Sequence, residues 1–278
     1  MKWRSAAWLL ALCSMACGRA SCRPTPEKRI AAEAISTALL LQQTPHRPLL
    51  VLRDSDAWTD SPEGLPSLTV YEDGLAITAE FVGDRGDVDA MVGQVEHPLE
   101  WVRWVEERGF ANYPLYTNVA GSTDQPTVTL SCRTGEQWRS VRVLGVHPDG
   151  HIQAKGGEPP PHFLEIHQAL HHLPLRDVHP YVPTEFRVEF WDAEMSGSGP
   201  DEAWPTDVPP PPNLVPDERS LGRPRHYTAT GEAGATLHRF VHGMPNGRPT
   251  VRTPSGERVA MWVHWMIPEQ ESIEQIEH

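Results

Sequence analysis

The sequence predicts an α+β protein, built mainly from antiparallel sheets with a few covering helices. Short β-type runs follow one another, and several pairs of runs are separated by glycine-containing turn signals, as in antiparallel hairpins. Between them lie longer stretches whose apolar residues recur at helical spacing. Hydrophobic residues make up 39% of the 278-residue chain and charged residues 22%, values of ordinary globular proteins that exclude wholesale disorder.

The first element after residue 24 is expected to be a helix over 25–42. Thr25 suits the N-cap, Pro26 suits the first turn, and apolar residues then recur at helical spacing as far as Leu41. The short apolar run 49–53 comes next and indicates a strand.

A hairpin is expected around Asp73 and Gly74, which separate the β-type runs 68–71 and 75–81. An Asp-Gly pair between two such runs is a strong hairpin signal, because glycine readily adopts the positive φ that a type I′ turn requires. The sequence therefore predicts a tight turn with a positive φ at Gly74.

A second helix is expected over 98–109. Pro98 suits its first turn, and Gly109 suits the left-handed conformation that often ends a helix. The remaining elements of this half are two strands joined by a turn, and then a helix: 127–132, 138–146 and 163–173.

The second half repeats this order loosely. Its expected strands and helix are 185–191, 225–230, 232–242 (the helix), 250–253 and 258–267. Residues 134–136 and 255–257 both read Thr/Ser-Gly-Glu and occupy matching places in the two hairpins. Two loosely similar strand-helix-hairpin halves that arose by duplication are therefore one interpretation, and two unrelated halves are the other.

The stretch 196–225 is rich in proline, which lacks the amide donor that a sheet requires. We expect this stretch to be a loop that pairs in no sheet, although Trp204 and Leu214 suggest that parts of it fold back on the protein. The predicted organisation is a signal peptide, a lipidated tether, an N-terminal α+β half and a C-terminal α+β half: 1–16, 17–24, 25–176 and 177–278.

The N-terminus predicts export. Lys2 and Arg4 precede an apolar run that is too short to span a bilayer and ends in small residues before Cys17. This arrangement resembles the lipobox of bacterial lipoproteins, in which the cysteine thiol receives a diacylglycerol. The resemblance implies a lipid anchor at Cys17 in the cell envelope, in the outer membrane facing the periplasm or the cell surface. A secretory signal cut without lipidation is the alternative.

Short segments along the rest of the chain resemble a group of uncharacterised bacterial secreted lipoproteins. These segments are 66–74, 127–146, 180–183, 203–205 and 265–268. The resemblance covers most of residues 48–268 and implies an exported location and one continuous architecture. It implies no particular activity.

Two cysteines, Cys22 and Cys132, remain as thiols after cleavage before Cys17. An exported protein reaches a compartment that permits disulfides, so a bridge between the two is one alternative. The chain has no framework of regularly spaced cysteines, and a buried strand position for Cys132 is the simpler interpretation.

Histidines cluster in 162–172, where His167 and His171 lie one helical turn apart and are the candidate metal ligands. The HExxH and HxxEH patterns of zinc hydrolases are absent, and no third donor stands at a motif spacing. We therefore expect the cluster to lie on a solvated helix face, with no bound metal and no cofactor.

The candidate binding residues are Trp58 and Trp204, which fall in predicted loops and could stack on a sugar ring or a peptide. The net charge of −13 repels nucleic acid. The sequence favours a membrane-anchored envelope lipoprotein with a non-catalytic role in binding a protein, peptide or glycan. The alternative is a hydrolase of envelope polymers or a metal-dependent enzyme that uses the histidines between His162 and His172.

Overall fold

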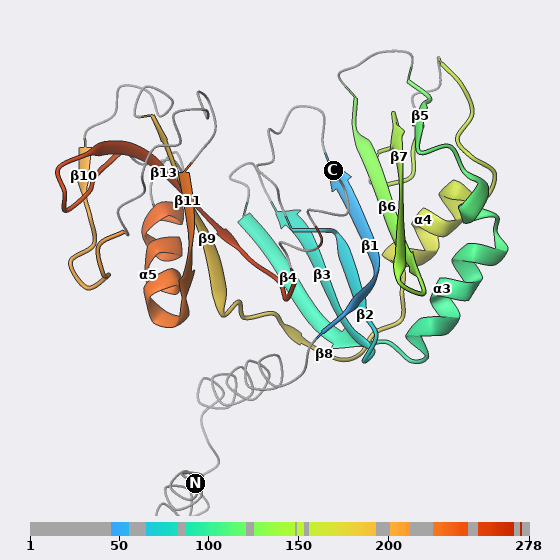
Figure 1. Ribbon diagram of the computed structural model, residues 1–278, viewed down its shortest axis with the longest axis horizontal. Helices are drawn as coiled ribbons and strands as arrows, with labels where there is room; N and C mark the ends of the chain where they lie inside the picture. Colours follow the sequence, from blue (N-terminus) through green and yellow to red (C-terminus); the bar gives the residue numbers. More distant parts are fainter. Residues whose placement is uncertain are drawn as a thin grey trace, which may run out of the picture. The chain divides into compact units, whose positions relative to one another are not determined.

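In the computed structural model, the described part of the chain is built around two β-sheets (Figure 1). The described residues are 46–55, 65–82, 87–120, 125–147, 149–152, 156–192, 201–211, 225–243, 250–269 and 273. They belong to one compact unit. The sheets are mostly antiparallel and helices accompany both, which confirms the predicted α+β class.

The larger sheet has eight strands in the order β5-β7-β6-β1-β2-β3-β4-β8. In chain order they are β1 (Pro48–Ser55), β2 (Leu68–Tyr71), β3 (Leu75–Val82), β4 (Asp87–Gln94), β5 (Tyr116–Asn118), β6 (Thr127–Thr134), β7 (Gln137–Leu144) and β8 (Arg176–Pro180). Neighbouring strands are antiparallel except β5, which runs parallel to β7 at the edge. The helices of this half are α3 (Pro98–Glu107), the 3₁₀ turn η1 (Phe110–Asn112) and α4 (Phe163–His171).

The smaller sheet has five strands in the order β10-β12-β13-β9-β11. They are β9 (Glu185–Asp192), β10 (Asp201–Ala203), β11 (Arg225–Thr230), β12 (Thr250–Arg252) and β13 (Arg258–Trp265), and helix α5 (Gly231–His242) packs on them. Its parallel pair is again at an edge, between β10 and β12.

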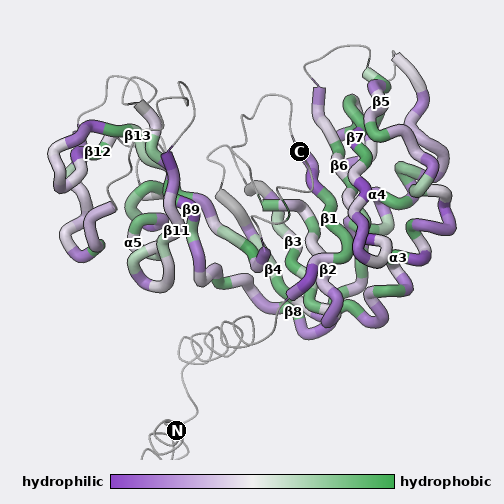
Figure 2. Tube along the Cα trace, viewed as in Figure 1, coloured by the Kyte–Doolittle hydropathy of each residue, from purple (hydrophilic) through white to green (hydrophobic). Residues whose placement is uncertain are grey.

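Strand β1 has a continuous apolar run because both faces of its sheet are covered there. Leu50 and Leu52 belong to the core beneath α3 and α4, whereas Val51 belongs to a second core on the opposite face. Figure 2 shows hydrophobic residues along β1, β2 and β3 and mostly hydrophilic residues at the edge strand β8. All five residues of β8 are exposed, which fits its place at the edge.

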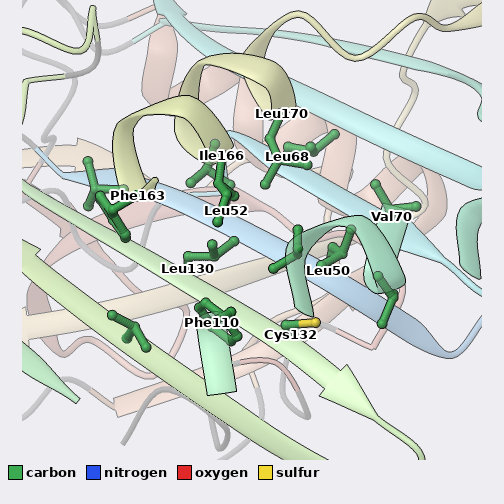
Figure 3. Packing of buried hydrophobic residues seen from close by; sticks show 14 of the residues in the cluster. Leu50, Leu52, Leu68, Val70, Phe110, Leu130, Cys132, Phe163, Ile166 and Leu170 are labelled. Atoms are coloured by element: carbon green, nitrogen blue, oxygen red, sulfur yellow. The ribbon is translucent and has the colours of Figure 1, made fainter. Parts of the chain in front are cut away.

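Helix α4 covers the sheet with an apolar stripe. Phe163, Ile166 and Leu170 are almost fully buried and point toward Leu52 and Leu68 of the strands below (Figure 3). Positions i, i+3, i+4 and i+7 share one face of a helix, and His167 is the fourth buried residue of this set. The same geometry brings His171 onto that face one turn later.

The predicted hairpin exists, with a different turn. Gly74 has a φ of +83°, and its amide donates to the carbonyl of Tyr71 at 3.0 Å. A type I′ turn requires positive φ at both central residues, and neither Glu72 nor Asp73 has one. The expected type I′ turn is therefore wrong. The connection is a three-residue loop that closes on a left-handed glycine, and a Cβ at Gly74 would lie 2.8 Å from the carbonyl oxygen of Val95.

Two expectations about the proline-rich stretch have different outcomes. Trp204 is buried in the core of the smaller sheet, so the chain does fold back there as expected. The expectation that nothing in 196–225 pairs in a sheet is wrong, because β10 pairs with β12. The three residues of β10 lie between Pro200 and Pro205 and retain their amide donors.

Candidate metal centre

The structure brings three ligand-type side chains together at the junction of β1 and α4. His167 and His171 come from successive turns of α4, and Asp54 comes from the end of β1. Because side chains alternate along a strand, Asp54 faces the same side as Leu50 and Leu52, which is the side that α4 covers. Contact is thus made between residues that are 113 positions apart in the chain.

The potential ligand atoms face one another at short distances. His167 Nε2 lies 2.9 Å from Asp54 Oδ1, and His171 Nε2 lies 2.9 Å from Asp54 Oδ2. The two Nε2 atoms are 3.1 Å apart. Since α4 and β1 are held by the core beneath them, the three side chains are positioned by the fold rather than by their own flexible ends.

The site is closed on the protein side and partly open on the other. The side chains of His167 and Asp54 are 1% and 6% exposed, and that of His171 is 27% exposed. The expected solvated helix face is therefore wrong for His167, which lies in the buried stripe of α4. The physical reason is that Phe163, Ile166 and Leu170 select the buried face, and position 167 falls within it.

Two opposing effects act on the carboxyl of Asp54. Burial raises its pKa, but the polar side chains of His167, His171 and Ser67 together outweigh burial and hold the pKa well below its ordinary value. Asp54 is consequently an anion at neutral pH, as a metal ligand must be.

Two buried polar atoms at the site have no hydrogen-bond partner among the described residues. One is Asp54 Oδ2, because its contact with His171 has the distance of an ion pair but not the alignment of a hydrogen bond. The other is Nδ1 of His167. Hydrogen bonding within the trio thus leaves a buried carboxylate oxygen unsatisfied, which a cation at the centre of the three side chains would correct.

The spacing fits a transition-metal ion. A tetrahedral ion with ligand distances of about 2.0–2.1 Å holds its donor atoms about 3.3 Å apart. The observed separations of 2.9 to 3.1 Å are only a few tenths of an ångström shorter, so small adjustments of the three side chains would accommodate the ion. Asp54, His167 and His171 would hold the ion, and their chemistry suits Zn²⁺ and related transition ions.

The same surroundings offer no obvious general base for hydrolysis. The residue after His167, where HExxH enzymes have a glutamate, is Gln168, whose amide cannot accept a proton from water. Glu165 is exposed and engaged with Arg108 at 2.7 Å and with His162 at 3.0 Å. The arrangement can therefore bind a metal, but it lacks the carboxylate that a zinc hydrolase of that type uses.

The other histidines of the predicted cluster lie outside this centre. His162 and His172 are exposed; His162 pairs with Glu165, and Nδ1 of His172 faces the carbonyl of Gln168. The sequence pattern predicted His167 and His171 but not Asp54, which stands at no motif spacing from them and is brought to them by the fold. A usable signal was present, because an acidic residue stands at an inward-facing position of a strand otherwise marked by leucines.

Trp204 is not the exposed binding residue that the sequence predicted. This side chain is 7% exposed, packs against Phe190 and donates its Nε1 hydrogen to the carbonyl of Val208 at 3.2 Å. It is a core residue and not a stacking platform. Trp58 lies outside the described residues, as do Cys17 and Cys22. Cys132 is a free, buried cysteine of β6, which confirms the simpler interpretation of that residue.

A separate open groove of about 730 Å³ lies beside strand β7, near the edge of the larger sheet. Aromatic Tyr116 and Trp138 line it together with Leu115 and Arg142. None of the three residues of the metal centre belongs to it.

Comparison with family models, with curated proteins and with solved structures finds no match to this chain. No helix within the described residues is long and apolar enough to cross a membrane. The resemblance to secreted lipoproteins thus stays a prediction from the sequence.

Proposed function

We propose that this protein is an exported, lipid-anchored envelope protein that binds one divalent transition-metal ion, such as Zn²⁺, at Asp54, His167 and His171. The observation that supports metal binding is the convergence of one carboxylate and two imidazoles, whose ligand atoms all lie within 4.8 Å of one another. Three protein ligands of this kind are the usual complement of a zinc site that keeps a further position for another ligand.

The ligand types favour a transition metal over Ca²⁺ or Mg²⁺. Both hard cations prefer oxygen ligands, and Ca²⁺ takes six to eight of them. Here two of the three donors are imidazole nitrogens, which suit Zn²⁺, Cu²⁺, Ni²⁺ and Fe²⁺. The proposal therefore replaces the expectation that the chain binds no metal.

Binding is a better proposal than hydrolysis of envelope polymers. Gln168 stands where a base would be needed, and Glu165 is held by Arg108. The bound ion supplies a Lewis-acidic centre, and the chain's own residues hold it in place without a carboxylate ready to take a proton.

The lipid anchor is proposed from the sequence alone. Cys17 follows an apolar run and small residues, the pattern that resembles a lipobox. We expect Cys17→Ser to abolish partitioning into the detergent phase while the circular dichroism spectrum of the protein stays unchanged. A Cys17→Ser protein that still enters the detergent phase would mean that the anchor lies elsewhere.

Metal binding is tested by equilibrium dialysis of the full-length protein against Zn²⁺, followed by elemental analysis. We expect one zinc per chain in the wild type and a loss of bound zinc in Asp54→Asn, which keeps the shape of the side chain and removes its charge. His172→Ala, at the residue that follows α4, is the matched control and should retain one zinc. Substoichiometric zinc in the wild type, or equal zinc in Asp54→Asn, would contradict the proposed function.

A further inference from the structure

We infer that the metal ion of this centre keeps one exchangeable coordination position, reached past His171, and that this position binds the oxygen of a small anion with a carboxylate or phosphate group. The inference rests on the proposed metal function and names the class of ligand that the bound ion would take.

Three protein ligands leave at least one coordination position of the ion without a side chain from the described residues. Across the described ranges, the group around Asp54 contains three side chains with a ligand atom and no fourth histidine, cysteine, aspartate or glutamate. Zn²⁺ and similar ions take at least four ligands. Among the described residues no further side chain fills the fourth position, which is therefore left to solvent or to a bound molecule.

The burial pattern shows where that ligand enters. Asp54 and His167 are enclosed by the strand and helix that carry them, at 6% and 1% exposure. His171 is 27% exposed and lies on the last turn of α4. A small molecule can thus approach the ion on the His171 side without any movement of α4 away from the sheet.

The net charge of the ion and its three ligands favours an anion at the remaining coordination position. A divalent ion held by one carboxylate and two neutral imidazoles leaves one net positive charge at a site of low exposure. Such a charge is costly unless it is paired, so an anionic oxygen stabilises the site more than a neutral ligand does. The strongly negative chain, with a net charge of −13, disfavours large polyanions and leaves small anions as the fitting class.

The ligand would be held and not cleaved. Gln168 cannot act as a base, and the nearby carboxylate of Glu165 is paired with Arg108 and His162. Within the described part of the chain, neither of these two residues would activate water against a carboxylate or phosphate oxygen bound to the ion.

The test uses full-length protein loaded with Co²⁺, whose visible absorption bands report its coordination. We expect stoichiometric Co²⁺ binding and a saturable shift of the bands on titration with acetate, with inorganic phosphate, or with both. The two titrations distinguish a carboxylate ligand from a phosphate ligand. Perchlorate at equal ionic strength should leave the bands unchanged, and the His172→Ala variant should respond as the wild type does.

Two different failures are distinguishable. If Co²⁺ binds stoichiometrically but neither anion shifts its bands, the ion has no exchangeable position, and the inference is overturned while the metal function stands. If neither Co²⁺ nor Zn²⁺ binds, the proposed function itself fails, and the inference fails with it.

Discussion

The two sheets share a layout that is reached by different connections. In each sheet one strand, β1 or β9, is antiparallel to both neighbours. One of these neighbours belongs to an antiparallel hairpin, and a three-residue parallel strand beyond the hairpin forms the edge. In the larger sheet the first hairpin strand, β6, pairs with β1. In the smaller sheet the second one, β13, pairs with β9. A simple tandem copy would preserve the order, so the duplication suggested by the two Gly-Glu turns stays a prediction.

The helices of the two sheets show a second difference. His167 of α4 meets the carboxylate of Asp54, whereas His238 of α5 lies 5.8 Å from the ring centre of Phe186 and 5.4 Å from that of Trp265. Both histidines belong to amphipathic helices packed on a sheet. The residues that the fold places beside each histidine therefore differ: a carboxylate beside His167 and two aromatic rings beside His238. A histidine at helical spacing is therefore weak evidence for a metal site until its strand is known.

The largest expected effect tests that difference directly. His171→Ala removes one of three ligand atoms and should weaken zinc binding at least about 100-fold, since even losses of groups that only orient a ligand reach that size. His238→Ala, in the other sheet, should leave zinc affinity unchanged. Isothermal titration calorimetry with Zn²⁺ measures both. Equal affinities in the two variants would show that α4 holds no metal centre.

A second comparison concerns two hairpin glycines with nearly the same φ, +83° at Gly74 and +87° at Gly256. A Cβ at Gly74 would also meet the carbonyl oxygen of Val95 at 2.8 Å, whereas one at Gly256 would meet nothing within 4 Å. We expect Gly74→Val to cost about 3 kcal/mol of unfolding free energy and Gly256→Val about 1 kcal/mol. Urea denaturation provides the values. A larger cost at Gly256 would reverse the expected ranking.

A third prediction concerns the close approach of α5 to its sheet. A Cβ at Gly234 would lie 2.3 Å from Cδ2 of Phe186 and 3.1 Å from the carbonyl oxygen of Ala229. Helix propensity alone favours alanine over glycine by up to about 1 kcal/mol. We nevertheless expect Gly234→Ala to destabilise the protein by about 2 kcal/mol, because the added methyl overpacks the core. A double-mutant cycle with Phe186→Leu should recover part of this loss, and a stabilised Gly234→Ala protein would contradict the packing.

The smallest effect is confined to alkaline pH and comes from two weak acids, one in each sheet: the buried thiol of Cys132 and the half-buried phenol of Tyr227. Burial raises the pKa of Cys132 from 9.0 to about 12 and that of Tyr227 from 10.0 to about 12. Both groups stay protonated in the folded state while the unfolded chain releases protons from pH 9 for the thiol and pH 10 for the phenol. Stability is unaffected by them below those values and falls as pH rises above them.

Thiol reagents and phenolate absorption check this expectation. Cys132 should react with a thiol reagent at pH 8 only after unfolding in urea, and the phenolate signal of Tyr227, isolated with Tyr227→Phe as reference, should develop near pH 12. Rapid thiol reaction in the folded protein would show that β6 is more accessible than its 1% exposure indicates.

Local elements were determined by the sequence because their causes are local. Gly74 and Gly109 have φ of +83°, and Pro98 begins α3, as the residues alone predicted. Strand β11 has the predicted bounds, Arg225–Thr230. Apolar spacing, turn residues and backbone conformation depend on neighbours within a few positions, so a pattern in the chain carries them.

The assembly of the candidate metal centre depends on the tertiary structure. Spacing along α4 identified His167 and His171 as a pair, but Asp54 is 113 positions from His167, and nothing local indicates that β1 lies beneath α4. That neighbourhood is set by which strands pair and which faces are covered, and these choices minimise the exposed apolar surface of the whole chain. The third ligand is therefore a property of the packed sheet and helix, whereas the first two are a property of the sequence.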